Sequence, residues 1–423
     1  MIRKLLISSL LLPTFVMAQE FDFDEEDVIE ENKPMEIPLD LKVSLFEARQ
    51  INPGRHVKTG ASLYEVFDYS KNGLRVRAES TFTFNKAFSL EDDPDNVVDV
   101  HELEWVPREL YVSQSWDRFT FLAGKQIKVL GKADFLSPLD VVAPKDATQL
   151  LFASPEEARI GQNLISLDYF HEGLNIWLAA SPSPAFDRLP EQGHPYGGPV
   201  IPGLDEEKDE GTEVYGKAEI ITADWELAFV AARAHLRSPL LGIAAPITPT
   251  LYYPDYRIIG VGATYVYSPF LLKLEVAHST DYPDWEAGAS LSELERHQVS
   301  FVTAGLDWNS DYYGTVLLEL SRSYASDESD LKGQLVNHTQ AAVSWSKSFW
   351  RETVSLSATG LLLDSFSNRI ARGDVAYRFM DDLELKLAGT SIAVEGGQSL
   401  LSEELGQFDR VEISLNWDYS FAE

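Results

Sequence analysis

The sequence contains no cysteine, which excludes disulfide bonds, thiol redox chemistry and cysteine-ligated metal centres. It also has no run of about 18 or more apolar residues, so it predicts no membrane-spanning helix. Basic residues are scarce: 35 Lys and Arg stand against 67 Asp and Glu, a formal net charge of −32. Because nucleic-acid-binding proteins need a basic surface, this balance argues against a nucleic-acid partner.

Motifs for catalysis and metal binding are absent as well. No two of the eight histidines have the i, i+4 spacing with an intervening acid that binds zinc. The sequence has no Gly-x-Ser-x-Gly elbow and no phosphate-binding glycine loop. The sequence still allows a hydrolytic Ser/His pair in which the histidine is His235 or His278. We predict that the protein is not an enzyme and uses no metal and no cofactor.

The first residues have the pattern of a signal peptide. Arg3 and Lys4 precede the apolar run 5–16, and Ala18 stands where a signal peptidase cleaves. We therefore expect residues 1–18 to be removed. Residues 19–40 are acidic and poor in apolar side chains, so we expect a disordered periplasmic segment, with a partial plug of a lumen as the alternative.

The segment near the C-terminus shows the clearest periodicity. From Val411 to Phe421 apolar and polar residues alternate strictly, and successive side chains of a strand point to opposite faces. Such a strand has one apolar and one polar face, as in a membrane barrel with lipid outside and a wet lumen inside. A strand of a soluble sandwich alternates in the same way, so the segment needs support from the rest of the chain.

The connections between strand-like runs supply that support. The runs occur in pairs joined by short turns such as Lys71-Asn72-Gly73, and long acidic, Pro- and Gly-rich segments separate the pairs. Short periplasmic turns and long outer loops are typical of outer-membrane barrels, which have an even number of strands in bacteria. We count seventeen runs, or eighteen with Leu41–Glu47. We predict an all-β, transmembrane, antiparallel up-and-down barrel of 16 or 18 strands over residues 41–423.

The polar faces of these strands carry charges of both signs. Strand periodicity assigns six pore-lining candidates to the lumen: Arg75, Arg77, Lys273, Glu275, Glu384 and Lys386. Opposite charges can line a water-filled pore, or they can form salt bridges that fill a narrow lumen. The sequence does not choose between these two arrangements.

Segment 130–162 is the candidate for a constriction of that lumen. Its turns Ser137-Pro138 and Ala143-Pro144 predict a stiff loop, and its apolar residues favour burial. We expect the loop to fold into the barrel and narrow it, with an outward loop capping the barrel as the alternative. The polar residues expected to act there are Lys132, Asp134, Asp140, Lys145, Asp146 and Arg159.

This segment also carries a family resemblance. Its motifs are Gly124-Lys125-Gln126, Gly131-Lys132 with Asp134, Pro138-Leu139-Asp140, Pro144-Lys145-Asp146, and Pro155-Glu156-Glu157 with Arg159. They resemble a poorly characterised family of proteobacterial outer-membrane barrels that are often encoded beside RND/MMPL-type exporters, and the similarity to alginate-export-type barrels is weaker. The resemblance implies transport of an apolar or lipid-like cargo, with an RND-type exporter and a companion lipoprotein as partners.

Together these features predict a channel or export component in the outer membrane of a Gram-negative bacterium. Its expected partners are outer-membrane lipid, lipopolysaccharide and the barrel assembly machinery. One alternative is a closed structural or binding barrel with acidic surface loops, and another is a barrel enzyme that acts on envelope lipids. The acidic loops could bind divalent cations through their carboxylates, although none has the spacing of a calcium motif.

Overall fold

The computed structural model describes residues 38–51, 54, 56–87, 102–148, 156–189, 205–244, 248–284, 294–325, 337–394 and 409–421. The expected signal peptide and most of the acidic segment, residues 19–37, lie outside this range. The first strand begins at Leu39, slightly before the predicted start at residue 41. No helix within the described ranges is long and apolar enough to cross a membrane.

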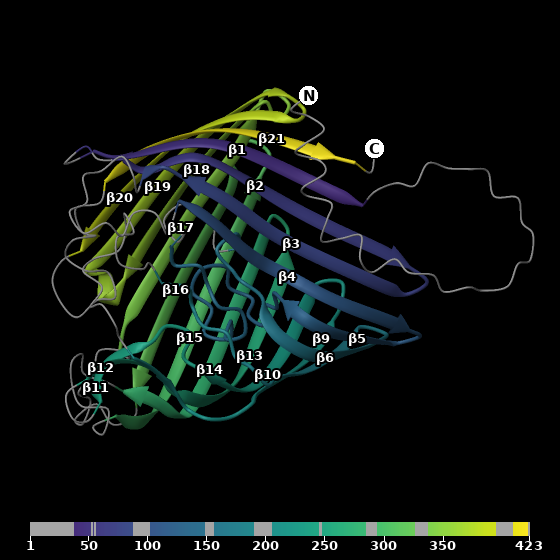
Figure 1. Cartoon of the computed structure of the whole chain (residues 1–423). Coiled ribbons are helices and arrows are strands. Elements are labelled where there is room, and N and C mark those ends of the chain that lie inside the picture. Colours follow the sequence, from purple (N-terminus) through teal and green to yellow (C-terminus); the bar gives the residue numbers. More distant parts are fainter. Residues whose placement is uncertain are drawn as a thin grey trace, which may run out of the picture. The chain divides into compact units, whose positions relative to one another are not determined.

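Eighteen antiparallel strands form one closed sheet (Figure 1). Each strand pairs with the next along the chain, and β1 pairs with β21, which closes the barrel. The structure therefore confirms the predicted barrel and selects the larger of the two predicted strand numbers. The strands are β1 Leu39–Gln50, β2 His56–Lys71, β3 Leu74–Asn85, β4 Leu103–Trp116, β5 Phe119–Gln126, β6 Gln162–His171, β7 Leu174–Ser181, β9 Glu213–Ile221, β10 Trp225–His235, β13 Asp255–Tyr267, β14 Phe270–Asp284, β15 Glu295–Ser310, β16 Gly314–Ala325, β17 Thr339–Phe349, β18 Val354–Leu363, β19 Asn368–Met380, β20 Leu383–Val394 and β21 Arg410–Ser420.

The two faces of the sheet differ in the way that the alternation predicts. On β14, Leu272, Leu274 and Val276 are 45%, 48% and 46% exposed. The residues between them, Lys273 and Glu275, are buried on the opposite face. Because the apolar face is the exposed one, it is the face that lipid covers, and the polar face lines the inside of the barrel.

The connections also follow the predicted rhythm. Two-residue turns such as Asn72-Gly73 and Glu172-Gly173 join strands at one end, and most connections at the other end are long. The links 51–55 and 364–367 are short exceptions at the long-loop end, and the second contains the 3-10 helix η5, Asp364–Phe366.

Two segments that the sequence predicted as plain loops contain strands. β8 Asp205–Lys208 pairs in parallel with β12 Thr248–Tyr253, which pairs with β11 Leu240–Ala244. These three strands form a sheet of their own, separate from the 18-stranded sheet. β14 continues past His278, because a bulge between Ser279 and Tyr282 carries its pairing with β15 on to Asp284.

Candidate functional site: a lumen with an inward loop

The six pore-lining candidates all lie on the polar face of the sheet. Arg75 and Arg77 share that face with the buried Glu79, since all three are two residues apart on β3. Lys273 and Glu275 share it on β14 in the same way, and Glu384 and Lys386 share it on β20. The groups that these six residues contact differ, and they divide the inner wall into three regions: an arginine network, the wall beneath the inward loop, and an open cavity.

Arginines on the first strands are bound in a carboxylate network. Arg77 forms ion pairs with Asp68 at 2.9 Å and with Glu79 and Glu109 at 2.7 Å each. Arg75 pairs with Asp68 as well, at 2.5 Å. Every arginine of this group thus faces an acid, and such pairs fix side chains in place more reliably than they stabilise a fold.

The chain after β5 runs back along the inner wall (Figure 1), where two carboxylates on the wall hold its backbone. Glu319 on β16 accepts hydrogen bonds from the backbone N–H of Asp134 at 2.6 Å and of Phe135 and Leu136 at 3.0 Å each. Glu275 accepts from the N–H of Ala133 at 2.7 Å. Both carboxylates are almost fully buried, at 3% and 0% exposure. They bind to main-chain donors, so they fix the path of the loop whatever its side chains are.

Two lysines complete this attachment. Lys132 Nζ lies 2.6 Å from carboxylate oxygens of both Glu219 and Glu226. Burial alone lowers the pKa of Lys132, but these two bonds outweigh burial and raise it. Lys273 on the wall pairs with Asp134 of the loop, and with Asp307 at 2.8 Å. The predicted loop residues Lys132 and Asp134 thus contact the inner wall directly.

The other predicted loop residues bind mainly to one another and to neighbouring loops. Arg159 pairs with Asp140 at 2.8 Å. Asp146 lies 3.2 Å from Arg188, and burial raises the pKa of this carboxyl. The backbone N–H of Lys145 donates to Asp187 at 2.7 Å. Asp146 and Lys145 thus join segment 127–148 to segment 182–189, and Arg159 joins the same segment to the residues just before β6, so the four residues hold loops together.

An apolar cluster also holds the loop. Leu130, Leu139, Val141 and Val142 pack with inward residues of β6, β7, β9, β10, β13 and β14, among which Trp177 is 1% exposed. Gly260 on β13 permits this contact: a Cβ there would lie 2.6 Å from Leu139 Cδ2 and 2.6 Å from the Val276 carbonyl oxygen. This part of the lumen is therefore a packed, dry core.

A buried group at the loop end was not predicted. Glu213 Oε2 accepts hydrogen bonds from Gln162 at 2.6 Å and Tyr215 at 2.5 Å, and Arg237 lies 3.0 Å from its carboxylate. His235 Nδ1 lies 3.0 Å from the same carboxylate, and its Nε2 lies 2.8 Å from the Asp209 carbonyl oxygen. Both ring nitrogens of His235 thus have partners, and the ring joins the end of β10 to Glu213 on β9 and to the backbone at Asp209.

The second histidine considered for catalysis has a serine partner. His278 Nδ1 lies 3.0 Å from Ser300 Oγ. Within the described ranges, no carboxylate is hydrogen-bonded or ion-paired to His278 to orient the ring as a hydrolase requires. Those ranges also contain no group of three or more His, Asp or Glu able to hold a metal ion.

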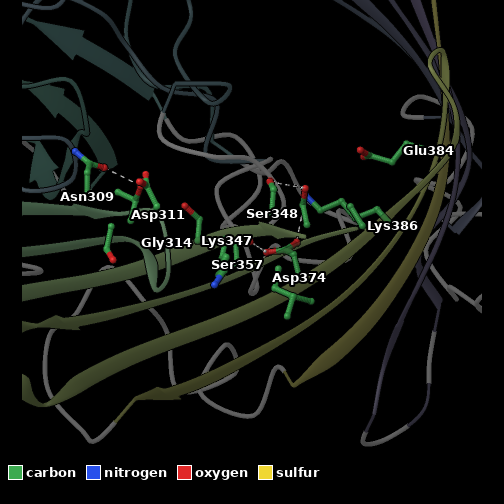
Figure 2. Close-up of a pocket in the computed structure, with 15 residues that line it drawn as sticks. Asn309, Asp311, Gly314, Lys347, Ser348, Ser357, Asp374, Glu384 and Lys386 are labelled. Atoms are coloured by element: carbon green, nitrogen blue, oxygen red, sulfur yellow. Dashed lines mark hydrogen bonds and ion pairs between the residues drawn. The ribbon is translucent and has the colours of Figure 1, made fainter. Parts of the chain in front are cut away.

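The wall beside the packed loop is open. A cavity of about 610 Å³ lies inside the barrel at the short-turn end of β15 to β20. Figure 2 shows Ser348, Ser357 and Asp374 around it, with Lys386 close to Asp374. Two of the predicted pore-lining residues, Glu384 and Lys386, line this cavity. The remaining four lie in the arginine network or beneath the loop.

Sequence reasoning overlooked Glu319, although a signal for it was present. In the segment Val316–Leu320, apolar residues at every second position surround Leu317 and Glu319. The same periodicity that assigned Glu275 to the lumen assigns Glu319 to it. Alternation shows on which face of the sheet a carboxylate lies, but it does not show which backbone N–H groups that carboxylate binds.

A closed, 18-stranded antiparallel sheet with an apolar outer wall and a largely polar inner wall defines an outer-membrane β-barrel. It places the protein in the outer membrane of a Gram-negative bacterium. No family model matches the sequence, and no curated protein is similar to it.

Solved structures of outer-membrane porins share the fold. OccK8 (OprE) of Pseudomonas aeruginosa superposes with a TM-score of 0.54 at 8% identity, over 90% of this chain and 97% of that one. OccK2 (OpdF) of the same organism, in complex with glucuronate, gives 0.53 at 9% identity over 90% and 98%. A BenF-like porin from Pseudomonas fluorescens Pf-5 gives 0.53 at 9% identity over 90% and 97%. At these identities the likeness concerns the fold alone.

Proposed function

We propose that the protein is a passive channel for small polar solutes across the outer membrane. The observation that carries the proposal is the asymmetry of the lumen. The inward loop is fixed to the wall at β14 and β16 by Glu275 and Glu319, whereas a cavity of about 610 Å³ remains inside β15 to β20. A loop that is fixed to one part of the wall narrows a barrel but leaves a path along the neighbouring part.

The fold of the structural neighbours supports this proposal, since one of them is described as a porin and another binds glucuronate. The inner wall around the cavity is polar and open, which suits hydrated solutes better than an apolar cargo. Two expectations therefore stay predictions that rest on the sequence motifs alone: transport of a lipid-like cargo, and a role beside an RND-type exporter and its lipoprotein. Contacts with lipopolysaccharide and with the barrel assembly machinery are proposals that follow from the location.

Single-channel recording in planar bilayers tests the proposal. The purified barrel should give discrete conductance steps in simple salt solutions. Folding is checked by the difference in gel migration between heated and unheated samples. A folded barrel that never conducts would instead support the closed structural or binding barrel, because the charges on its inner wall would then fill the lumen as salt bridges.

A further inference from the structure

We propose that the open wall of the lumen binds neutral, polyhydroxylated solutes such as sugars. The site is a hydroxyl wall, defined as Ser344, Ser346 and Ser348 of β17 with Thr359, Ser357 and Ser355 of β18. The inference rests on the proposed channel function, because a solute must enter the lumen to reach this wall. It adds the chemical class of the solute, which the comparisons do not assign to this chain.

The hydroxyls form three cross-strand pairs along one face. Ser344 is opposite Thr359, Ser346 is opposite Ser357 and Ser348 is opposite Ser355. Successive pairs are two residues apart, so they repeat about every 6.8 Å and span about 14 Å along the wall. Four of the six, Ser346, Ser348, Ser355 and Ser357, line the 610 Å³ cavity. The wall therefore presents regularly spaced hydroxyls to open space.

These hydroxyls keep hydrogen-bonding capacity for a ligand. Ser344 and Thr359 lie 3.1 Å apart at their oxygens, and Ser348 and Ser355 lie 3.2 Å apart. Each hydroxyl has one proton and two lone pairs, so such a pair uses only one proton and one lone pair. Ser357 donates to Asp374 at 3.3 Å and keeps only its lone pairs, but each bonded pair still has one free proton, so the wall offers both donors and acceptors. A sugar hydroxyl needs both kinds of partner, whereas a carboxylate can only accept.

The charges beside the wall balance one another. Asp374 pairs with Arg372 at 2.8 Å and with Lys386 at 3.2 Å. Glu384 lies 3.8 Å from Arg378, and Arg372 also lies 3.6 Å from Glu412. Three basic groups thus face three carboxylates. The other two charged residues that line the cavity, Asp311 and Lys347, have opposite signs, so an anionic solute meets no excess of positive charge here. The six residues of the hydroxyl wall carry no charge.

The decisive measurement compares glucose with glucuronate, which has a similar ring with one carboxylate added. Binding is measured on the detergent-solubilised barrel by ligand-observed NMR, and from the current noise that each solute adds to open channels. The key variant is Ser346→Ala/Ser357→Ala, which removes one directly opposed pair. The matched control is Ser113→Ala, since Ser113 is only 5% exposed.

We expect glucose to bind more tightly than glucuronate, and the folded double variant to weaken glucose binding about tenfold. Ser113→Ala should bind glucose as the unchanged protein does. Equal or tighter binding of glucuronate overturns the inference, and so does glucose binding that the double variant leaves unchanged. Because NMR detects binding without ion flow, a barrel that binds glucose but never conducts refutes the channel and not the hydroxyl wall.

Discussion

Replacing Glu319 by Gln should loosen the inward loop from the barrel wall. The carboxylate accepts three backbone N–H groups, at 2.6, 3.0 and 3.0 Å. Glutamine offers one oxygen, and its NH₂ group turns a donor toward at least one of these N–H groups. A hydrogen bond to a charged group contributes about 1.5–3 kcal/mol, and a neutral one about 1 kcal/mol. The loss of one bond and the weakening of the other two therefore cost about 2.5–7 kcal/mol of loop attachment.

That cost lowers the ratio of attached to detached loop by about 60-fold to about 100,000-fold. Glu275 still holds the neighbouring turn through Ala133 and through Ser137, whose Oγ donates to it at 2.8 Å. The single variant should therefore release only residues 134–136 from the wall. We expect this partial release to be seen as fluctuations of the single-channel current. The double variant Glu275→Gln/Glu319→Gln should release the whole turn and raise the mean conductance.

The assay is single-channel recording, with Glu384→Gln as the matched control. This variant also removes one negative charge from the inner wall, but Glu384 lies at the cavity and pairs with Arg378. Each variant must first show normal heat-dependent gel migration. If the folded double variant conducts as the unchanged protein does, with no added fluctuation, then the loop does not constrict the channel and the reasoning fails.

Three further predictions test the outer wall, the dry core and the loop attachment. Leu274→Lys places a charge on the lipid-facing wall and should destabilise the barrel by about 2–4 kcal/mol in urea unfolding from bilayers, whereas Leu274→Ile should have little effect. Trp177→Ala removes a side chain that is 1% exposed and should cost about 3–5 kcal/mol in the same assay. The pKa of Lys132 is raised in the folded protein. The ion pairs of Lys132 therefore contribute fully to loop attachment below the pKa of the unfolded chain, and this contribution is lost as the pH rises through the pKa of the folded protein. Conductance should thus be steady from neutral to mildly alkaline pH and rise only in strongly alkaline solution, and a rise already near pH 8 would contradict this.

The barrel could be predicted from the sequence because lipid imposes a rule on every strand. On β21 the outward residues Val411, Ile413 and Trp417 alternate with the inward Ser414 and Asn416, and the structure keeps that assignment. Backbone groups inside a bilayer must be paired, so a chain with these strands has to close. Alternation and turn signals were therefore sufficient for the fold.

β10 shows where this rule weakens. Its central residues Ala228, Phe229, Val230, Ala231 and Ala232 are apolar on both faces. Phe229 faces outward and is 49% exposed, whereas Val230 faces inward and is 3% exposed. The inner face is apolar because it packs in the cluster that contains the loop residues Leu139 and Val141. Alternation disappears wherever the lumen is filled by protein, and only the tertiary structure shows this.

The attachments of the loop were beyond sequence reasoning for a related cause. Asp134 and Glu319 are 185 positions apart, and the donor is a backbone N–H, which every residue except proline carries. No residue pattern marks such a donor. The same limit applies to Glu213, whose partners come from two distant segments, Gln162 from one and His235 with Arg237 from the other.

The net charge of −32 is also a poor guide to the cavity. Beside the hydroxyl wall, three basic groups face three carboxylates, so fixed charge there is balanced. The acids beneath the loop, by contrast, bind backbone amides and outnumber the nearby Lys132 and Lys273. The electric field in a narrow, water-filled lumen depends on the charges close by, because salt screens charges that lie more than about 8 Å away in water. The acidity of the whole chain therefore says little about what the open wall can bind, and the pairing of each inward side chain decides it.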